Sequence, residues 1–277
     1  MGYGAPKLTH LGDALGGAFA HGAARQGGGD QPMIDVYGMS TPNAVKITIM
    51  LEELGLPYRQ HHVNVFAGEQ HAREFLQISP NNKVPVIVDA DGPEGTALPV
   101  FESGAILIYL AEKSGRLLPA RGAARATVLE WLMVQLSGVG PMFGQLVHFT
   151  RYAPAGNDYS VNRYTSEVRR LFGVLERRLG HSAYLGGAEY SIADIATWPW
   201  IRTAVSIFPW LTQAAEKGEA LAQWPALAGW FRTLGARAAV ERGVAQGERF
   251  LDRDRAAFGA ADADAFDRFF NRGKYAR

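Results

Sequence analysis

The segment KVPVIVDADGPEGTALPVFES, which runs from Lys83 to Ser103, decides the fold of the first half of the chain. Two short apolar runs, 84–90 and 97–102, flank a turn rich in Asp, Gly and Pro, and this pattern predicts a hairpin of two antiparallel strands. Pro85 lies inside the first run, where a proline would remove a hydrogen bond from an ordinary strand. We therefore expect either a trans-proline at a sheet edge or a cis peptide bond after Val84. The cis form would turn the backbone of Val84 outward to pair with an extended peptide.

The residues on either side of this hairpin alternate between strand and helix patterns. Thr41 is a good N-cap, Pro42 fits the first helical position, and Gly55 ends the helix that follows. The expected elements are strand 33–38, helix 42–54, strand 58–66, short helix 68–78, the hairpin and helix 103–115. The first crossover makes a parallel pair. We thus predict a mixed four-stranded sheet with helices on its faces, which is a thioredoxin-like arrangement.

The second half of the chain has a different pattern. From residue 123 to about 246 the sequence shows helical periodicity and no convincing strand. The predicted fold class is α/β plus all-α, with a thioredoxin-like N-terminal domain followed by an all-helical C-terminal domain. The expected parts are an N-terminal extension 1–32, a thioredoxin-like domain 33–119, a helical domain 123–247 and a C-terminal tail 248–277. Three residues of the tail lie at helical spacing and could pack on the body of the protein: Phe266, Phe269 and Phe270.

The composition excludes several classes of function. The formal net charge is +1 and no long run of Lys or Arg occurs, so we expect no nucleic-acid partner. No stretch of about 18 apolar residues is present, and we expect no membrane span. The chain has 0 cysteines, which excludes disulfides, thiolate metal sites and a cysteine nucleophile. We predict no metal site. Because the N-terminus also lacks the pattern of a secretory signal, we expect a cytoplasmic protein.

An acidic and a hydroxyl residue lie where the last predicted strand meets a helix. Ser103 would begin the helix, whose first N–H groups and positive end suit a carboxylate. Glu102, directly before it, could face an ammonium group. The pair therefore favours a ligand in which a carboxylate and an ammonium group are attached to the same carbon. Ser103 could instead serve only as a helix cap, but this leaves Glu102 without a purpose.

The turn STPN, Ser40–Asn43, lies at the start of the first helix and could support a sulfur atom. Thiol pKa values fall at helix N-termini and beside hydrogen-bond donors. The hydroxyl and backbone N–H of Thr41 and the side-chain amide of Asn43 could donate to a thiolate that a ligand supplies, and we predict both residues to be catalytic. The alternative is that Thr41 only caps the helix. Ser40 and Tyr37 are rival hydroxyls, although Tyr37 lies inside the strand.

Four segments together resemble the glutathione S-transferases: NKVPVIVD from Asn82, FESGAILIYLAEK from Phe101, YSIADIATWPW from Tyr190 and STPNAVKITIMLEEL from Ser40. The first three are typical of the superfamily, and the fourth resembles its bacterial nu class, which has a Thr-Pro-Asn turn. The resemblance covers roughly residues 33–247. It implies glutathione as the cofactor, with its γ-glutamyl end at the helix start described above. It also implies a homodimer.

The resemblance implies a binding role for each matching residue. The expected glutathione-binding residues are Gln70, Lys83, Val84, Pro85, Glu102, Ser103 and Arg163. In this assignment Val84 pairs with the cysteinyl unit, Lys83 meets the glycyl carboxylate, and Arg163 reaches the ligand of a neighbouring subunit. Lys83 and Gln70 could instead be exposed surface residues. Arg163 could simply pair with Glu167, four residues further along a helix.

The segment YSIADIA is typical of a helix start and not of a reaction. Ser191 as N-cap and Asp194 three residues later form a capping-box pattern. We therefore expect Asp194 to support the folding of the helical domain and to leave the chemistry of the ligand site unaffected.

A second substrate would have to be apolar or aromatic. The stretch GPMFGQLVHFTRYAP supplies Phe149 and Tyr152, which we predict to contact such a ligand, unless they belong to an ordinary helix core. Without a protein thiol, disulfide reduction requires glutathione to supply both sulfurs, so two molecules would enter one site. The resemblance implies such disulfide-bond reduction, or cleavage of aromatic glutathione thioethers. Conventional conjugation to an electrophile and a non-enzymatic binding protein are the alternatives.

Overall fold

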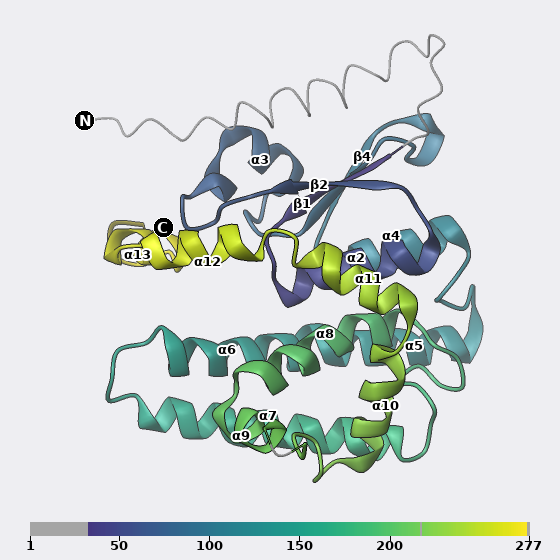
Figure 1. Cartoon of the computed structure of the whole chain (residues 1–277). Coiled ribbons are helices and arrows are strands. Elements are labelled where there is room, and N and C mark those ends of the chain that lie inside the picture. The colour runs from purple at the N-terminus through teal and green to yellow at the C-terminus, as the bar shows by residue number, and fades with distance from the viewer. Residues whose placement is uncertain (1–32, 217, 276–277) are drawn as a thin grey trace. The chain divides into compact units, whose positions relative to one another are not determined.

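A computed structural model describes residues 33–275 of the chain, except residue 217. Its sheet has four strands in the order β2-β1-β3-β4 (Figure 1). The strands are β1 (Ile34–Gly38), β2 (Tyr58–His62), β3 (Val86–Asp89) and β4 (Leu98–Phe101). Strands β1 and β2 are parallel, whereas β3 is antiparallel to both β1 and β4. The predicted parallel pair and the predicted hairpin are both confirmed.

The helices that follow β1 and β4 lie where the sequence predicts them. They are α2 (Pro42–Leu54), η2 (Glu69–His71), α3 (Arg73–Ile78), η3 (Pro93–Gly95) and α4 (Ser103–Ser114). Thr41 caps α2 with its side chain, and Gly55 ends that helix in the left-handed conformation at φ 69°. The predicted helix 68–78 is divided, because Ala72 is extended between the short 3₁₀ turn η2 and α3.

After β4 the described chain is helical apart from one isolated bridge between Tyr184 and Gly187. The helices are α5 (Gly122–Val134), the π-helical turn η4 (Gln135–Val139), α6 (Gly140–Arg151), α7 (Asp158–Leu179), α8 (Ile192–Ile207), α9 (Pro209–Ala215), α10 (Pro225–Gly235), α11 (Ala238–Gly247), α12 (Leu251–Ala260), α13 (Ala263–Phe269) and η5 (Gly273–Tyr275). The predicted all-helical second half is confirmed.

The chain forms two compact units. Among the described residues, the thioredoxin-like unit comprises 33–106 together with 243–275, and the helical unit comprises Leu107–Arg242. The division lies inside α4, and it places α12 and α13 with the sheet. One buried cluster between the sheet and α3 forms a core of the thioredoxin-like unit: Tyr37, Val63, Ala72, Phe75, Ile78, Val86 and Val88.

The C-terminal helices are attached to the thioredoxin-like unit by side chains and by close backbone contact. A Cβ atom added to Gly243 would lie 2.5 Å from Cα of Ile49, so α11 approaches α2 as only glycine allows. Phe66 contacts the rings of Phe266 and Phe269 at 5.9 and 5.2 Å. The predicted packing on the body is thereby confirmed for Phe266 and Phe269, whereas Phe270 contacts these two rings. Figure 1 shows α12 and α13 as the yellow end of the chain.

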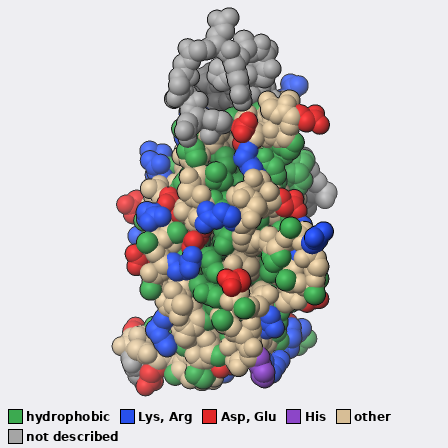
Figure 2. All heavy atoms as spheres, turned by 90° about the vertical axis from the view of Figure 1, so that its right-hand side faces the viewer, with side chains coloured by type: hydrophobic (Ala, Val, Ile, Leu, Met, Phe, Trp, Pro, Cys, Tyr) green, Lys and Arg blue, Asp and Glu red, His purple; other side chains and the backbone are tan. Residues whose placement is uncertain are grey.

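Acidic and basic side chains are interspersed over the face of the molecule shown in Figure 2. This agrees with the near-balanced charge of the sequence, which has 28 Lys and Arg and 27 Asp and Glu. Within the described ranges, no helix combines the length and the apolar character that crossing a membrane requires.

Candidate functional site

The STPN turn joins β1 to α2, and Thr41 occupies the N-cap position with extended backbone, φ −118° and ψ 155°. Its Oγ1 accepts a hydrogen bond from the backbone N–H of Ala44 at 3.2 Å. A hydroxyl can accept one bond and still donate its own proton, so capping does not exclude support of a thiolate. The backbone N–H of Thr41 donates to the carbonyl of Met39 at 2.8 Å. Because the turn itself uses this N–H, its contact with the sulfur stays a prediction.

The two rival hydroxyls are placed less suitably. Tyr37 has 0% exposure inside β1 and stacks on the ring of His61. Burial, reinforced by the charge of Asp35, raises the pKa of the Tyr37 hydroxyl, which further disfavours its ionisation. The Ser40 Oγ atom is buried near the Asp254 carboxylate and makes no hydrogen bond of good geometry among the described residues. Of the three, only Thr41 keeps a hydroxyl at the start of α2.

A small pocket of about 170 Å³ lies next to this turn. Its lining contains six of the predicted site residues: Asn43, Lys83, Val84, Pro85, Glu102 and Ser103. The remaining lining residues are Ser79 and Phe101. The peptide bond between Val84 and Pro85 is cis, as expected. The start of α2, the segment before β3 and the start of α4 are distant in sequence and therefore line one pocket together.

A buried lysine lies directly behind the start of α4. Lys46, which is 1% exposed, places Nζ 3.2 Å from Oγ of Ser103. Burial lowers the pKa of Lys46 to about 7, and the nearby charge of Glu102 partly opposes this effect. An ammonium group has donors only, so when Lys46 is protonated Ser103 Oγ must accept from it and directs its own proton elsewhere. Sequence reasoning missed Lys46; the available signal is a single charge within the apolar run of α2.

The acid beside Ser103 adopts an unusual backbone conformation. Glu102 has φ 68°, in the left-handed region that non-glycine residues rarely occupy, and such residues are often found at functional sites. Its Oε1 accepts a hydrogen bond from Nδ2 of Asn81 at 3.1 Å. The carboxylate is exposed and lines the small pocket. It is therefore placed to meet a cationic group of a ligand.

Two further predicted residues of the thioredoxin-like unit differ in burial. Gln70 is 4% exposed, and its Oε1 has no hydrogen-bond partner in the part of the chain that the structure describes. The alternative of an exposed Gln70 is thus wrong, and a buried acceptor of this kind is suited to a ligand donor. Lys83 has an exposed side chain, and its backbone carbonyl accepts from the Ser79 hydroxyl at 2.8 Å.

The other three predicted residues lie in the helical unit. Arg163 on α7 pairs with Glu167 at 3.6 Å, which is the surface pair considered as its alternative. Phe149 on α6 stacks on Tyr164, with ring centroids 5.4 Å apart. Tyr152 ends α6 half-buried, and burial raises the pKa of its hydroxyl. Phe149, Tyr152 and Tyr164, with His148 in contact with the first two, form an aromatic cluster at α6 and α7, and this cluster stays a predicted substrate surface.

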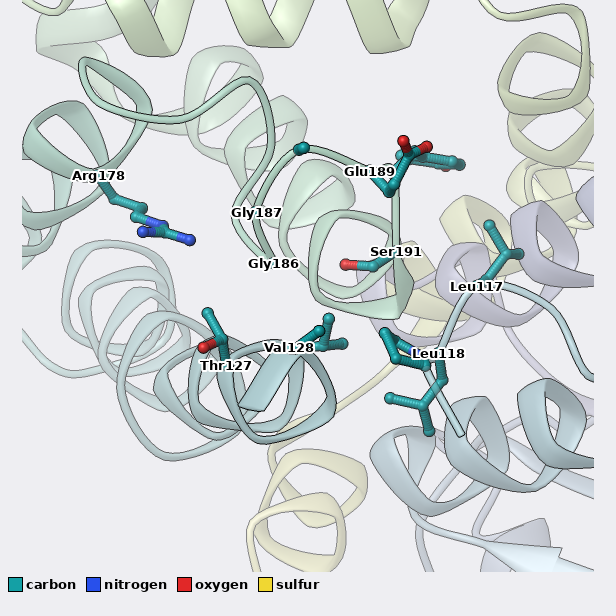
Figure 3. A pocket seen from close by; sticks show the side chains of 13 residues that line it. Leu117, Leu118, Thr127, Val128, Arg178, Gly186, Gly187, Glu189 and Ser191 are labelled. Carbon is teal, nitrogen blue, oxygen red and sulfur yellow. The ribbon is translucent and has the colours of Figure 1, made fainter. Parts of the chain in front are cut away.

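The helical unit also contains a larger open pocket of about 710 Å³ (Figure 3). Leu117 and Leu118 line it on one side, and Val128 and Arg178 on others. The Arg178 guanidinium donates from Nε to the Leu185 carbonyl at 2.9 Å. The guanidinium group therefore holds the loop before α8. We assign no glutathione contact to this pocket.

The residues described contain no cluster of three or more His, Asp or Glu side chains that could hold a metal ion. The small pocket is lined by hydrogen-bond donors, the exposed lysine Lys83 and the exposed carboxylate of Glu102, and Lys46 is buried behind Ser103. Together with a thioredoxin-like sheet and a following helical unit, these features define a thioredoxin-like protein whose polar pocket is suited to a zwitterionic, peptide-like ligand.

Comparison with known proteins agrees with this class. The model for the glutathione S-transferase N-terminal domain matches residues 32–112, and the model for the C-terminal domain matches residues 158–233. The chain is 48% identical over 210 residues to the disulfide-bond oxidoreductase YfcG of Escherichia coli (strain K12), covering 75% of this chain and 92% of YfcG. The chain belongs to the glutathione S-transferase superfamily, and the predicted resemblance, including that to the nu class, is confirmed.

Two solved structures are similar over most of their length. One is a glutathione transferase family member from Pseudomonas fluorescens pf-5 with two glutathione bound. It is 42% identical with a TM-score of 0.72, covering 82% of this chain and 97% of that chain. The other is a glutathione transferase from Pseudomonas putida with one glutathione disulfide bound per protein subunit. It is 38% identical with a TM-score of 0.71, covering 86% of this chain and 98% of that chain.

Proposed function

We propose that this protein is a glutathione-dependent disulfide-bond reductase in which the reacting thiolate belongs to bound glutathione. The observation that carries the proposal is the Thr41 hydroxyl, which caps α2 and retains a proton to donate, in a chain with 0 cysteines. The N-terminal end of α2 adds a favourable field for the thiolate. Asn43, which lines the small pocket, is the second donor.

The γ-glutamyl end of glutathione fits the start of α4. When Lys46 is protonated, Ser103 accepts from it and donates its own proton to the ligand carboxylate. Glu102 faces the ligand ammonium from the same pocket. The backbone of Val84 pairs with the cysteinyl unit, and Lys83 meets the glycyl carboxylate. Gln70 is a further contact, through the buried Oε1 described above.

The reaction balances with two glutathione molecules. The first thiolate attacks one sulfur of the substrate disulfide, forms a mixed disulfide with it and expels the other sulfur as a thiolate. A second glutathione thiolate then attacks the glutathione sulfur of the mixed disulfide and expels the remaining substrate thiolate. Two glutathione molecules are oxidised to one glutathione disulfide, and the substrate takes up two electrons and two protons. The two glutathione molecules and the glutathione disulfide found in the two Pseudomonas relatives support this stoichiometry.

One set of assays tests the proposal. Purified protein is given glutathione with a hydroxyethyl disulfide, with a chlorodinitrobenzene-type electrophile, and with a β-aryl glutathione thioether. The proposal expects the disulfide to be the best substrate by kcat/KM. A preference for the electrophile would establish conjugation instead, and a preference for the thioether would establish lyase activity. Glutathione binding with no turnover of any of the three would indicate a binding protein.

The aromatic cluster of the helical unit gives the expected surface for the second substrate, with Phe149 and Tyr152 as contacts. Membership of the superfamily supports a homodimer, in which Arg163 would act across the interface. Sedimentation equilibrium would test the dimer, and Arg163→Ala would test the contact. If the protein is a dimer and the substitution does not change its affinity for glutathione, Arg163 is only a surface partner of Glu167.

A further inference from the structure

Helix α12 places one carboxylate against the turn that holds Thr41. Asp254 Oδ2 accepts a hydrogen bond from the backbone N–H of Ser40 at 2.7 Å, and Asp254 Oδ1 lies 2.7 Å from Nε2 of His62. Ser40 directly precedes Thr41, and His62 is the last residue of β2, paired in register with Gly38 of β1. Asp254, which is 214 residues from Ser40 in the sequence, therefore joins the turn after β1 to the last residue of β2.

The Asp254 carboxylate is well enclosed. The residue is 8% exposed, although the other residues of α12 are mostly exposed. Burial alone would raise the pKa of the Asp254 carboxyl, but donation from His62 and from the Ser40 amide outweighs it and lowers this pKa below its ordinary value. At neutral pH the side chain is thus an ionised acceptor, which suits a bond to a backbone N–H.

The helices before and after Asp254 are anchored on the thioredoxin-like unit. A Cβ added to Gly243 or to Gly247 of α11 would lie within 2.7 Å of atoms of α2. On the other side, Arg268 of α13 donates from Nη2 to the carbonyl of Phe66 at 2.7 Å. Asp254 therefore approaches the turn from a helix that is fixed at both ends.

Helix α2 holds only the Thr41 end of the turn, where the Thr41 carbonyl accepts from the Val45 N–H at 3.0 Å and its hydroxyl from the Ala44 N–H. Of the backbone amides of Ser40 and Thr41, the second donates to the nearby carbonyl of Met39, and the first donates to Asp254. Loss of the Asp254 acceptor would leave the Ser40 N–H without its partner in a partly buried place, which favours rearrangement of the turn. A small displacement of a donor is enough to reduce its support of a reacting atom.

We propose that Asp254 is a positioning residue, which holds the Met39–Thr41 turn so that the Thr41 hydroxyl faces the thiol of bound glutathione. This inference rests on the proposed function, in which Thr41 supports the thiolate. It assigns a role in the reaction to the C-terminal helices, beyond packing.

The test compares three variants of the full-length protein with the wild type. Asp254→Ala removes the acceptor. Asp254→Asn keeps an oxygen for the Ser40 N–H and an amide that can donate to a neutral His62. Asp252→Ala is the matched control, because Asp252 lies on the same helix with a fully exposed side chain. The measurements are kcat and KM for disulfide reduction, the pKa of the bound glutathione thiol from its ultraviolet absorbance, and amide hydrogen exchange of Ser40–Asn43.

For Asp254→Ala we expect kcat to fall about tenfold or more, with the KM for glutathione within about threefold of wild type, since the γ-glutamyl contacts are untouched. The pKa of the bound thiol should rise by about one unit, and exchange of the turn amides should accelerate about tenfold. Asp254→Asn should recover kcat to within about threefold of wild type. Asp252→Ala should leave all four measurements unchanged.

Three results would overturn the proposal. In the first, Asp254→Ala lowers thermal stability while kcat, the thiol pKa and hydrogen exchange of the folded protein stay at wild-type values, which shows a structural role only. In the second, Asp254→Ala does not fold, and Asp254→Glu, which displaces the carboxylate by one methylene group, has wild-type kcat. In the third, the wild type binds glutathione without lowering its thiol pKa, which refutes the proposed function and this proposal with it.

Discussion

At the scale of single residues, the proposed function gives two tasks to the hydroxyl of Thr41. It accepts from the Ala44 amide as the cap of α2 and has a proton left for a thiolate. We expect Thr41→Ala to lower kcat for disulfide reduction about tenfold or more, because a preorganised donor is lost. The free energy of unfolding should fall by about 1 kcal/mol from the lost cap. Thr41→Ser, which keeps the hydroxyl, should retain most of kcat.

Steady-state kinetics and chemical denaturation measure both effects. The comparison with Ser40→Ala decides between the two neighbouring hydroxyls, since the buried Ser40 Oγ should contribute little. Near wild-type turnover in Thr41→Ala, together with loss of turnover in Ser40→Ala, would show that the wrong hydroxyl has been assigned.

Lys46 predicts a pH dependence of stability. Its pKa is about 7 in the folded protein against an ordinary value of 10.5. Between these pH values the unfolded chain carries more protons on this group, so stability rises with pH, by at most about 1.4 kcal/mol per pH unit. Below pH 7 the lysine is protonated in both states and the cost of burying the charge is fully present. Lys46→Met should therefore stabilise the protein most near pH 6–7 and progressively less toward pH 10.

Urea denaturation of wild type and Lys46→Met across this pH range measures the difference. Exposed Lys113, changed to Met, is the matched control and should show no such trend. Parallel stability curves for wild type and Lys46→Met would contradict the prediction. Because Lys46 also orients Ser103, the variant should bind glutathione more weakly even where it is more stable.

At the scale of elements, the start of α8 depends on one carboxylate. Asp194 is 0% exposed and accepts from the backbone N–H groups of Leu185 and Ser191, from the Ser191 hydroxyl and from Nε1 of Trp230. The capping box that the sequence predicts is present. Asp194 thus also fixes the loop before the helix and a tryptophan of α10, two contacts that a local motif does not reveal.

We expect Asp194→Ala to lower the free energy of unfolding by about 3 kcal/mol or more, because several buried donors lose their acceptor. Guanidinium denaturation measures this change, with the exposed Glu189→Ala as control. The folded fraction should bind glutathione as the wild type does. Unaltered stability with lost turnover would instead place Asp194 in the reaction.

Where the predicted elements differ from the structure, a local contact explains the difference. The strand predicted over 58–66 ends at His62, because the Asn64 side chain accepts from the N–H groups of Phe66 and Ala67 and forms a turn. Apolar alternation continued through this turn and indicated a longer strand. The Thr41 cap, the cis-proline and the start of α4 could be predicted because each depends on neighbouring residues. Lys46 and Asp254 could not, since their roles depend on partners far along the chain.

At the scale of the whole molecule, the sequence likewise reveals features that depend on neighbouring residues and does not reveal contacts between distant ones. The order of strands and helices predicted a thioredoxin-like half and a helical half. The sequence did not indicate that α12 and α13 belong with the sheet, since their contacts with Ser40 and Phe66 span about 200 residues. Helical spacing of the tail phenylalanines predicted that they pack, but a periodicity contains no information about the partner.

The absence of cysteine predicts a property of the whole protein in turnover. All 277 residues lack a thiol, so in the proposed reaction both attacking sulfurs come from glutathione. Treatment of the protein with iodoacetamide, followed by its removal, should leave disulfide reductase activity unchanged. A cysteine-dependent glutaredoxin treated in the same way is the control and should be inactivated. Intact-mass spectra during turnover should show no protein adduct of glutathione, while one glutathione disulfide accumulates for each substrate disulfide reduced. Loss of activity after alkylation, or a covalent glutathione adduct on the chain, would show that a protein group takes part in the exchange and would refute the two-glutathione reaction.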